Sequence, residues 1–165
     1  MARTYEPIST QTFSGSQSTL SFTSIPQTYT DLICVVSGGA SAAPFIRLNA
    51  NSTAQYSSTR LLGTGSAEQT GLRARADGAP NDTRMEIGAG VSADIPLNVF
   101  HVFNYTNTTT LKTVLCRADG VSSAVSIQAG LYNSTAAITT IEIGNTNSAN
   151  FDAGSTITLY GILAA

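Results

Sequence analysis

The chain has 165 residues, only 11% of them charged, and a formal net charge of −2. This length predicts one domain, and the lack of a basic excess argues against a nucleic-acid partner. Hydrophobic residues make up 42% of the chain, which excludes the disordered class because disorder goes with low hydrophobicity and high net charge. Lys112 is the only lysine, so Ser, Thr and Asn must hydrate the surface. A surface so poor in charge is weakly defended against association, and we expect self-assembly.

No segment has the pattern of a targeting sequence or a membrane span. Residues 1–7 are polar and lack the apolar centre of a signal peptide. No apolar run approaches the ~20 residues of a membrane helix. We therefore expect synthesis in a cytoplasm and no membrane partner. Cys34 and Cys116 lie in strand-like runs, which favours buried free thiols over a disulfide.

The N-terminal segment, residues 1–18, is polar with isolated apolar side chains at Tyr5, Ile8 and Phe13. We interpret it as an extended arm that precedes one domain at residues 19–165. The three apolar side chains are candidate assembly contacts.

Strands are predicted next. Residues 19–25 alternate between apolar and polar side chains, and Pro26 ends that strand. Residues 29–37 form a nearly continuous apolar run, which predicts a strand that is buried on both faces or central in a sheet. A short strand is expected at residues 45–49.

The stretch at residues 65–94 is the least regular part of the chain. Residues 72–75 and 84–87 could form short strands, separated by a turn. Four of the seven arginines lie between Arg60 and Arg84. Arg73, Arg75 and Arg84 are therefore further candidate assembly contacts, although a solvated irregular loop is an equally good interpretation.

The C-terminal half predicts a β-hairpin at residues 98–117 and strands at 124–132, 138–143 and 156–162. The last strand is so apolar that it must lie inside a sheet. In all, eight to ten short strands with turns every 8–12 residues and no helical period predict an all-β fold, an antiparallel β-sandwich. We favour a jelly roll, while a galectin-like or immunoglobulin-like strand order stays open. No helix longer than two turns is expected.

The sequence carries no catalytic signature. His101 is the only histidine and lies in mid-strand, where a half-buried, hydrogen-bonded structural role is expected rather than a general base. One histidine and two cysteines are too few for a zinc site, and the turn aspartates lack the spacing of a calcium loop. A carboxylate pair for glycoside hydrolysis is a remote alternative. We expect no enzymatic activity, no cofactor and no metal.

Several runs resemble a family of small virion structural proteins of tailed bacteriophages, many from phages of marine bacteria and cyanobacteria. The runs are residues 29–32, 46–49, 55–63, 130–138 and 150–162. The last is the most specific, with the sequence NFDAGSTITLYGI, and the similarity extends from Tyr5 to Ile162 apart from a variable middle. The resemblance implies a part of the phage particle, located in the virion and made in the cytoplasm of the host bacterium.

Two functional hypotheses follow. The first is a capsid decoration (cement) protein on the outer surface of the head, working as a homo-oligomer, expected to be a trimer, in contact with the major capsid protein. The second is a tail-fibre or receptor-binding module with a lectin-like sandwich that recognises host surface glycans. Tyr56 and Tyr132, each next to a polar turn, are the aromatic candidates for glycan contact.

Overall fold

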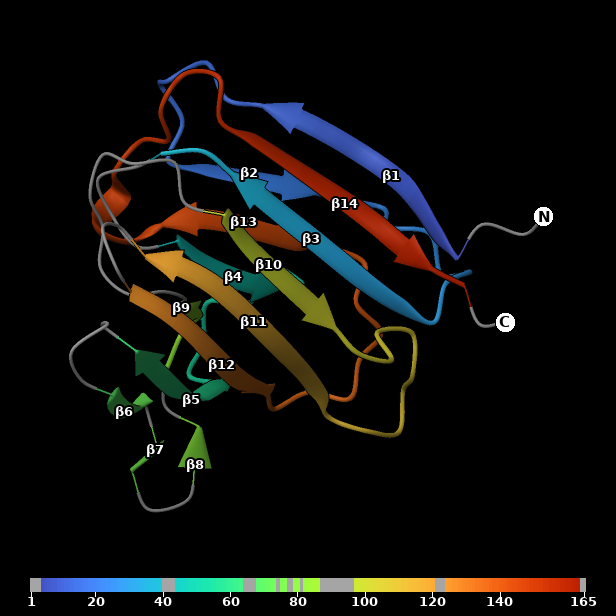
Figure 1. The fold of residues 1–165 in the computed structure, drawn as a ribbon. Coiled ribbons are helices and arrows are strands. Elements are labelled where there is room, and N and C mark those ends of the chain that lie inside the picture. The colour runs from blue at the N-terminus through green and yellow to red at the C-terminus, as the bar shows by residue number, and fades with distance from the viewer. Residues whose placement is uncertain are drawn as a thin grey trace.

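Two antiparallel sheets lie face to face in the structure, a computed structural model that describes residues 4–39, 44–63, 68–73, 75–76, 79–80, 82–86, 97–120 and 124–163 (Figure 1). The strands are β1 (Tyr5–Thr12), β2 (Thr19–Phe22), β3 (Asp31–Ser37), β4 (Pro44–Leu48), β5 (Tyr56–Gly63), β6 (Glu68–Arg73), β7 (Arg75–Ala76), β8 (Ala79–Pro80), β9 (Met85–Glu86), β10 (Leu97–Val102), β11 (Lys112–Gly120), β12 (Ala124–Tyr132), β13 (Ile141–Asn145) and β14 (Thr156–Ile162). The described helical structure is one 3-10 turn, η1 (Thr146–Ser148). The expected all-β sandwich, without a helix longer than two turns, is confirmed for the described residues.

The larger sheet has the strand order β1-β14-β3-β10-β11-β12-β5-β6, and the smaller has the order β2-β13-β4-β9. β7 and β8 form a separate two-stranded pair. In Figure 1 the larger sheet lies toward the viewer and the smaller sheet covers its rear face. The predicted hairpin is confirmed as β10 and β11, and the predicted central strand is confirmed as β3 between β14 and β10. A jelly-roll connectivity stays a prediction.

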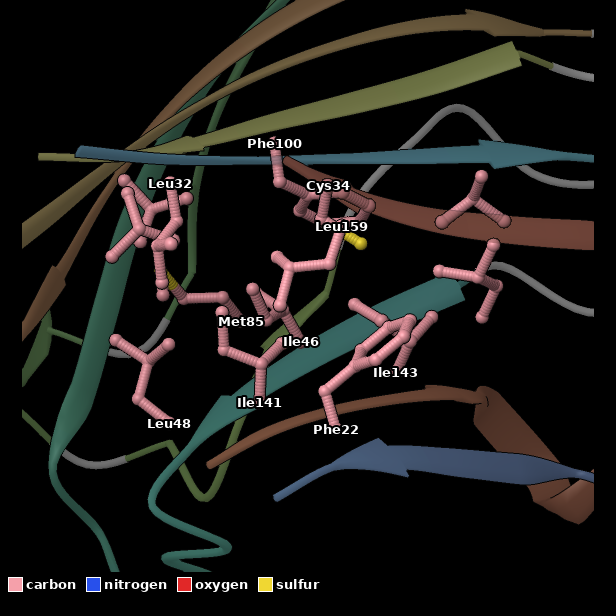
Figure 2. Packing of buried hydrophobic residues seen from close by; sticks show 14 of the residues in the cluster. Phe22, Leu32, Cys34, Ile46, Leu48, Met85, Phe100, Ile141, Ile143 and Leu159 are labelled. Carbon is pink, nitrogen blue, oxygen red and sulfur yellow. The ribbon is translucent and has the colours of Figure 1, made fainter. Parts of the chain in front are cut away.

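The core fills the space between the sheets because each strand turns alternate side chains inward. In β3 the buried residues are Leu32, Cys34 and Val36, with half-buried residues between them. Figure 2 shows Cys34, Phe100 and Leu159 of the larger sheet on one side of the core and Ile46, Ile141 and Ile143 of the smaller sheet on the other. Each such side chain contributes about 1.5–3 kcal/mol when fully buried, so this layer holds the two sheets together.

The N-terminal segment, which precedes the boundary expected at residue 18, contributes β1 to the larger sheet. β1 pairs antiparallel with β14 from Tyr5↔Ile162 to Thr12↔Thr156. After the strand, Phe13 is buried and its ring stacks on Phe151 at 4.1 Å. The free edge of β14 offers backbone donors and acceptors, and the segment takes them because an unpaired edge is costly.

Candidate interaction surfaces

The outer face of the larger sheet, which points away from the smaller sheet, is rich in exposed aliphatic side chains over β10, β11, β12 and β5. The most exposed are Val125 (66%), Leu61 (51%), Leu97 (46%) and Ile127 (45%). The outer face of an antiparallel sheet is usually polar. No described strand packs against this surface, which we call the outer apolar face (Figure 1).

Strand β12 reverses the usual pattern of apolar side chains inside and polar ones outside. Its buried row contains Ser126 and Gln128, and the Gln128 amide donates to Ser58 Oγ at 2.8 Å. Gly130 belongs to the same row, and a Cβ there would stand 2.0 Å from the Met85 sulfur. Because Met85 of β9 comes so close, the inward row of β12 has room for small side chains only at this point. The aliphatic row of β12 must then face outward.

Cross-strand pairing gathers the outward side chains into continuous rows. Val99 lies opposite Arg117, which pairs with Ile127, which pairs with Leu61. In the next row Leu115 lies opposite Ala129. Side chains this close across strands contact each other, so the outer apolar face is one patch and not a set of isolated residues.

Part of the outer apolar face is hollowed, with a volume of about 620 Å³. Its lining includes Leu97, Val125 and Ile127, and also the charged pair Arg117 and Asp119 of β11. The backbone N–H of Leu97 donates to Asp119 Oδ1, which holds that carboxylate in place. Arg117 has no hydrogen bond or ion pair within the described part of the chain, so its guanidinium is available at the surface.

The only lysine of the sequence, Lys112, is fully buried at the start of β11. Its ammonium donates to the carbonyl oxygens of Asn107 at 2.5 Å, Thr110 at 2.9 Å and Thr135 at 3.1 Å. Burial lowers the pKa of Lys112 from its ordinary value because desolvation penalises the charged form. The side chain therefore fixes the loop between β10 and β11 to the segment after β12, and it leaves no lysine charge at the surface.

A second, polar hollow of about 360 Å³ lies at the smaller sheet. Ile46 points into the core, so its neighbours Phe45 and Arg47 lie on the outer side of β4. The guanidinium carbons of Arg47 and Arg84 lie 4.7 Å and 5.2 Å from the centre of the Phe45 ring. Arg47 also pairs with Glu142 at 2.7 Å. The hollow thus combines an aromatic ring with two cationic groups, and Ser18, Thr19, Asn145 and Ser148 complete its lining.

The predicted assembly contacts do not form one site. Tyr5 is 55% exposed on β1, whereas Ile8 is half-buried against the core. Phe13 is 1% exposed and belongs to the core. Arg84 lies at the polar hollow. The backbones of Arg73 and Arg75 belong to β6 and β7, and their side chains lie outside the described part of the structure.

Tyr56 and Tyr132 are not surface aromatics, which corrects their interpretation as glycan contacts. Both are buried, and their rings stack at 4.8 Å. The Tyr56 hydroxyl accepts from Leu48 N–H at 3.0 Å and lies 3.1 Å from the Asn51 carbonyl oxygen, to which it can donate. Burial raises the pKa of Tyr56 above its ordinary value. These contacts tie the turn after β4 to the core.

The histidine and the cysteines have the structural positions expected of them. His101 is half-buried, its Nε2 lies 3.0 Å from Asp31 Oδ2, and its ring stacks on Phe103 at 3.9 Å. Cys34 and Cys116 are buried free thiols, and burial raises the pKa of both. A thiol that keeps its proton is a poor nucleophile.

Within the residues that the structure describes, no three His, Cys, Asp or Glu side chains gather as a metal site would require. A search of the same residues finds no helix with the length and apolar character needed to cross a membrane.

Comparisons with known proteins give little guidance to function. No protein-family model matches the chain, and no curated protein matches it. Among solved structures, the chain is similar to a family 7 alginate lyase, A1-II′, crystallised as a variant in complex with its substrate. The identity is 8% and the TM-score 0.29, and the match covers 83% of this chain and 63% of the lyase chain. This chain thus spans less than two thirds of the length of the lyase, and a similarity so distant supports no conclusion about activity.

Proposed function

We propose that this protein is a structural component of a tailed-phage virion, a capsid decoration (cement) protein on the outer surface of the head. The observation that carries the proposal is the outer apolar face. An exposed apolar surface of this kind is costly for a protein that works alone, and it marks an interaction site. The resemblance of residues 150–162 to phage virion proteins suggests that the assembly is a phage particle.

A cement protein acts by binding, not by chemistry. It stabilises a head against the pressure of packaged DNA because it binds the closed shell and not the opened one. Area and rigidity are what such a role needs. The two packed sheets give rigidity, and many copies on a symmetric shell let weak individual contacts act together.

We assign the contact with the major capsid protein to the outer side of the smaller sheet, at the polar hollow. Arg47 and Arg84 there present two guanidinium groups over the Phe45 ring. Guanidinium groups attract carboxylates, so an acidic patch on the capsid protein is the matching partner. Self-association then uses the opposite side of the sandwich, the outer apolar face.

The location in the particle is tested by gold-labelled antibodies against the purified protein, applied to intact phage particles. We expect gold on the outside of the head. Label confined to tail fibres, or absent from particles, contradicts the proposal. A second assay adds purified protein to heads that lack it. There we expect saturable binding by the natural chain and weakened binding by Arg84→Glu, with Thr23→Glu, at an exposed position after β2, as the control.

The polar hollow also favours a second candidate, a receptor-binding module. Two guanidinium groups suit a carboxylate-bearing sugar of a host glycan, because the cations bind its acid. Binding of the purified protein to acidic but not neutral glycans on an array, together with label on tail fibres, would favour this candidate.

A further inference from the structure

We propose that the outer apolar face is the contact between two copies of this chain, packed sheet on sheet about a two-fold axis that crosses β11 between Arg117 and Asp119. This inference concerns self-association in solution. It stands or falls independently of whether the protein binds a phage head.

The pattern of β12 is the first argument. Val125 and Ile127 are largely exposed, while Ser126 and Gln128 in the other row are buried. In an isolated sandwich the apolar row of a strand is expected to face the core and the polar row to face solvent, which is the opposite of what β12 shows. It becomes the normal arrangement if a second sheet packs on the outer face, because both faces of β12 are then interior.

The size of the face is the second argument. Neighbouring strands lie about 4.8 Å apart and rise about 3.3 Å per residue, so the four strands, with about seven residues each, span on the order of 450 Å² in projection. The relief of the side chains increases the accessible area further. A stable interface takes about 800 Å² from each partner. The outer apolar face from β10 to β5 is therefore of the right order for a dimer.

The charges identify the partner as a second copy. Arg117 and Asp119 stand two residues apart on the outward row of β11, among aliphatic neighbours. About the proposed axis each Arg117 faces Asp119 of the partner subunit, so two opposite-charge pairs form together. A partner of one charge sign would satisfy only one of these groups and leave the other unpaired. A second copy satisfies both.

The test is a charge exchange, measured by sedimentation equilibrium of the purified full chain without heads. The natural chain, of 17.1 kDa, is expected at twice that mass. Arg117→Glu places like charges opposite each other twice, and so does Asp119→Arg. We expect each single variant to weaken dimerisation at least tenfold. The double variant Arg117→Glu/Asp119→Arg restores complementary pairs and should recover most of that loss.

Mixing the two single variants gives the most specific result. In a mixed pair the introduced glutamate of one copy faces the introduced arginine of the other, and the two natural residues, Arg117 and Asp119, face each other. We therefore expect heterodimers where each variant alone is monomeric. Val125→Asp should also abolish the dimer, while Thr23→Asp, an exposed position outside the face, should not.

Circular dichroism checks that each variant is folded, so that a lost dimer can be separated from a lost fold. A monomer at high concentration, a trimer, or a dimer insensitive to these charge exchanges overturns the inference.

Discussion

Gly161 lies against the ring of Tyr29, so close that a Cβ at Gly161 would stand 2.3 Å from Tyr29 Cγ. Tyr29 precedes β3 and Gly161 belongs to β14, which pairs with β3. The glycine therefore lets an aromatic ring lie flat on a strand. The contact with Tyr29 is the physical reason for a glycine at this position.

Gly161→Ala should destabilise the fold by about 1–3 kcal/mol, because the new methyl group must displace the Tyr29 ring or the strand. Urea unfolding followed by circular dichroism measures the change. The matched control is Gly63→Ala, where the nearest atom to the new Cβ is Val125 Cγ2 at 3.9 Å. Equal effects at the two positions would show that the Tyr29 contact is not the cause.

Lys112→Met should destabilise the protein by about 2–4 kcal/mol, because three buried carbonyl groups lose their donor while the side-chain stem is preserved. Chemical denaturation gives the value. Thr113→Met, on the exposed side of the same strand, should change stability by less than about 0.5 kcal/mol. If Lys112→Met is neutral, the three hydrogen bonds do not hold the loop.

Phe13→Ala should cost about 3–5 kcal/mol, because it empties a core position stacked on Phe151. Tyr5→Ala, at an exposed position at the start of β1, should stay within about 0.5 kcal/mol. Thermal unfolding of both variants separates the two ends of the strand. Deleting residues 2–13 is consequently expected to unfold the domain, and not merely to remove an attachment segment.

Stability should fall as the pH rises above about 9. The folded pKa values of Cys34 and Cys116 are raised above the ordinary thiol value of 9.0, so the unfolded chain releases protons that the folded chain keeps. Each thiol then removes about 1.4 kcal/mol of stability per pH unit. Lys112 has the opposite effect on stability at pH values just below its ordinary pKa of 10.5. Its folded pKa is lowered, so there the folded chain releases a proton that the unfolded chain keeps.

Denaturant unfolding from about pH 8 to about pH 10.5 measures this dependence. The double variant Cys34→Ala/Cys116→Ala is less stable at every pH, but its stability should fall less steeply because both thiol ionisations are gone. An unchanged slope would assign the alkaline loss to the tyrosines.

The strands with strong apolar patterns could be predicted from the sequence. β3 lies in a nearly continuous apolar run and β14 shows an apolar alternation, because each strand turns one row of side chains into the core. The hairpin of β10 and β11 could be predicted because its two strands follow each other in the chain. In each case the signal is local, because the pattern of apolar residues within the segment reflects which of its side chains are buried.

The features that could not be predicted depend on distant contacts. β1 is an edge strand that is only partly buried, so its side chains lack a clear period and look like an arm. Tyr56 follows a polar turn and looks exposed, yet its hydroxyl bonds the backbone of Leu48, eight residues away. The outer apolar face did have a signal in the sequence, because Val125 and Ile127 form the more apolar row of their strand.

The pairing of β1 with β14 sets the order of events during synthesis. Tyr5 has its ladder partner at Ile162, and β2 likewise waits for β13. A ribosome must therefore release nearly the whole chain before either early strand can close its ladder, and contacts so far apart in sequence make folding slow. Until then the aliphatic strands lie open to other nascent chains. Slow translation and low temperature should consequently raise the yield of folded protein, because they give each chain time to pair its own strands.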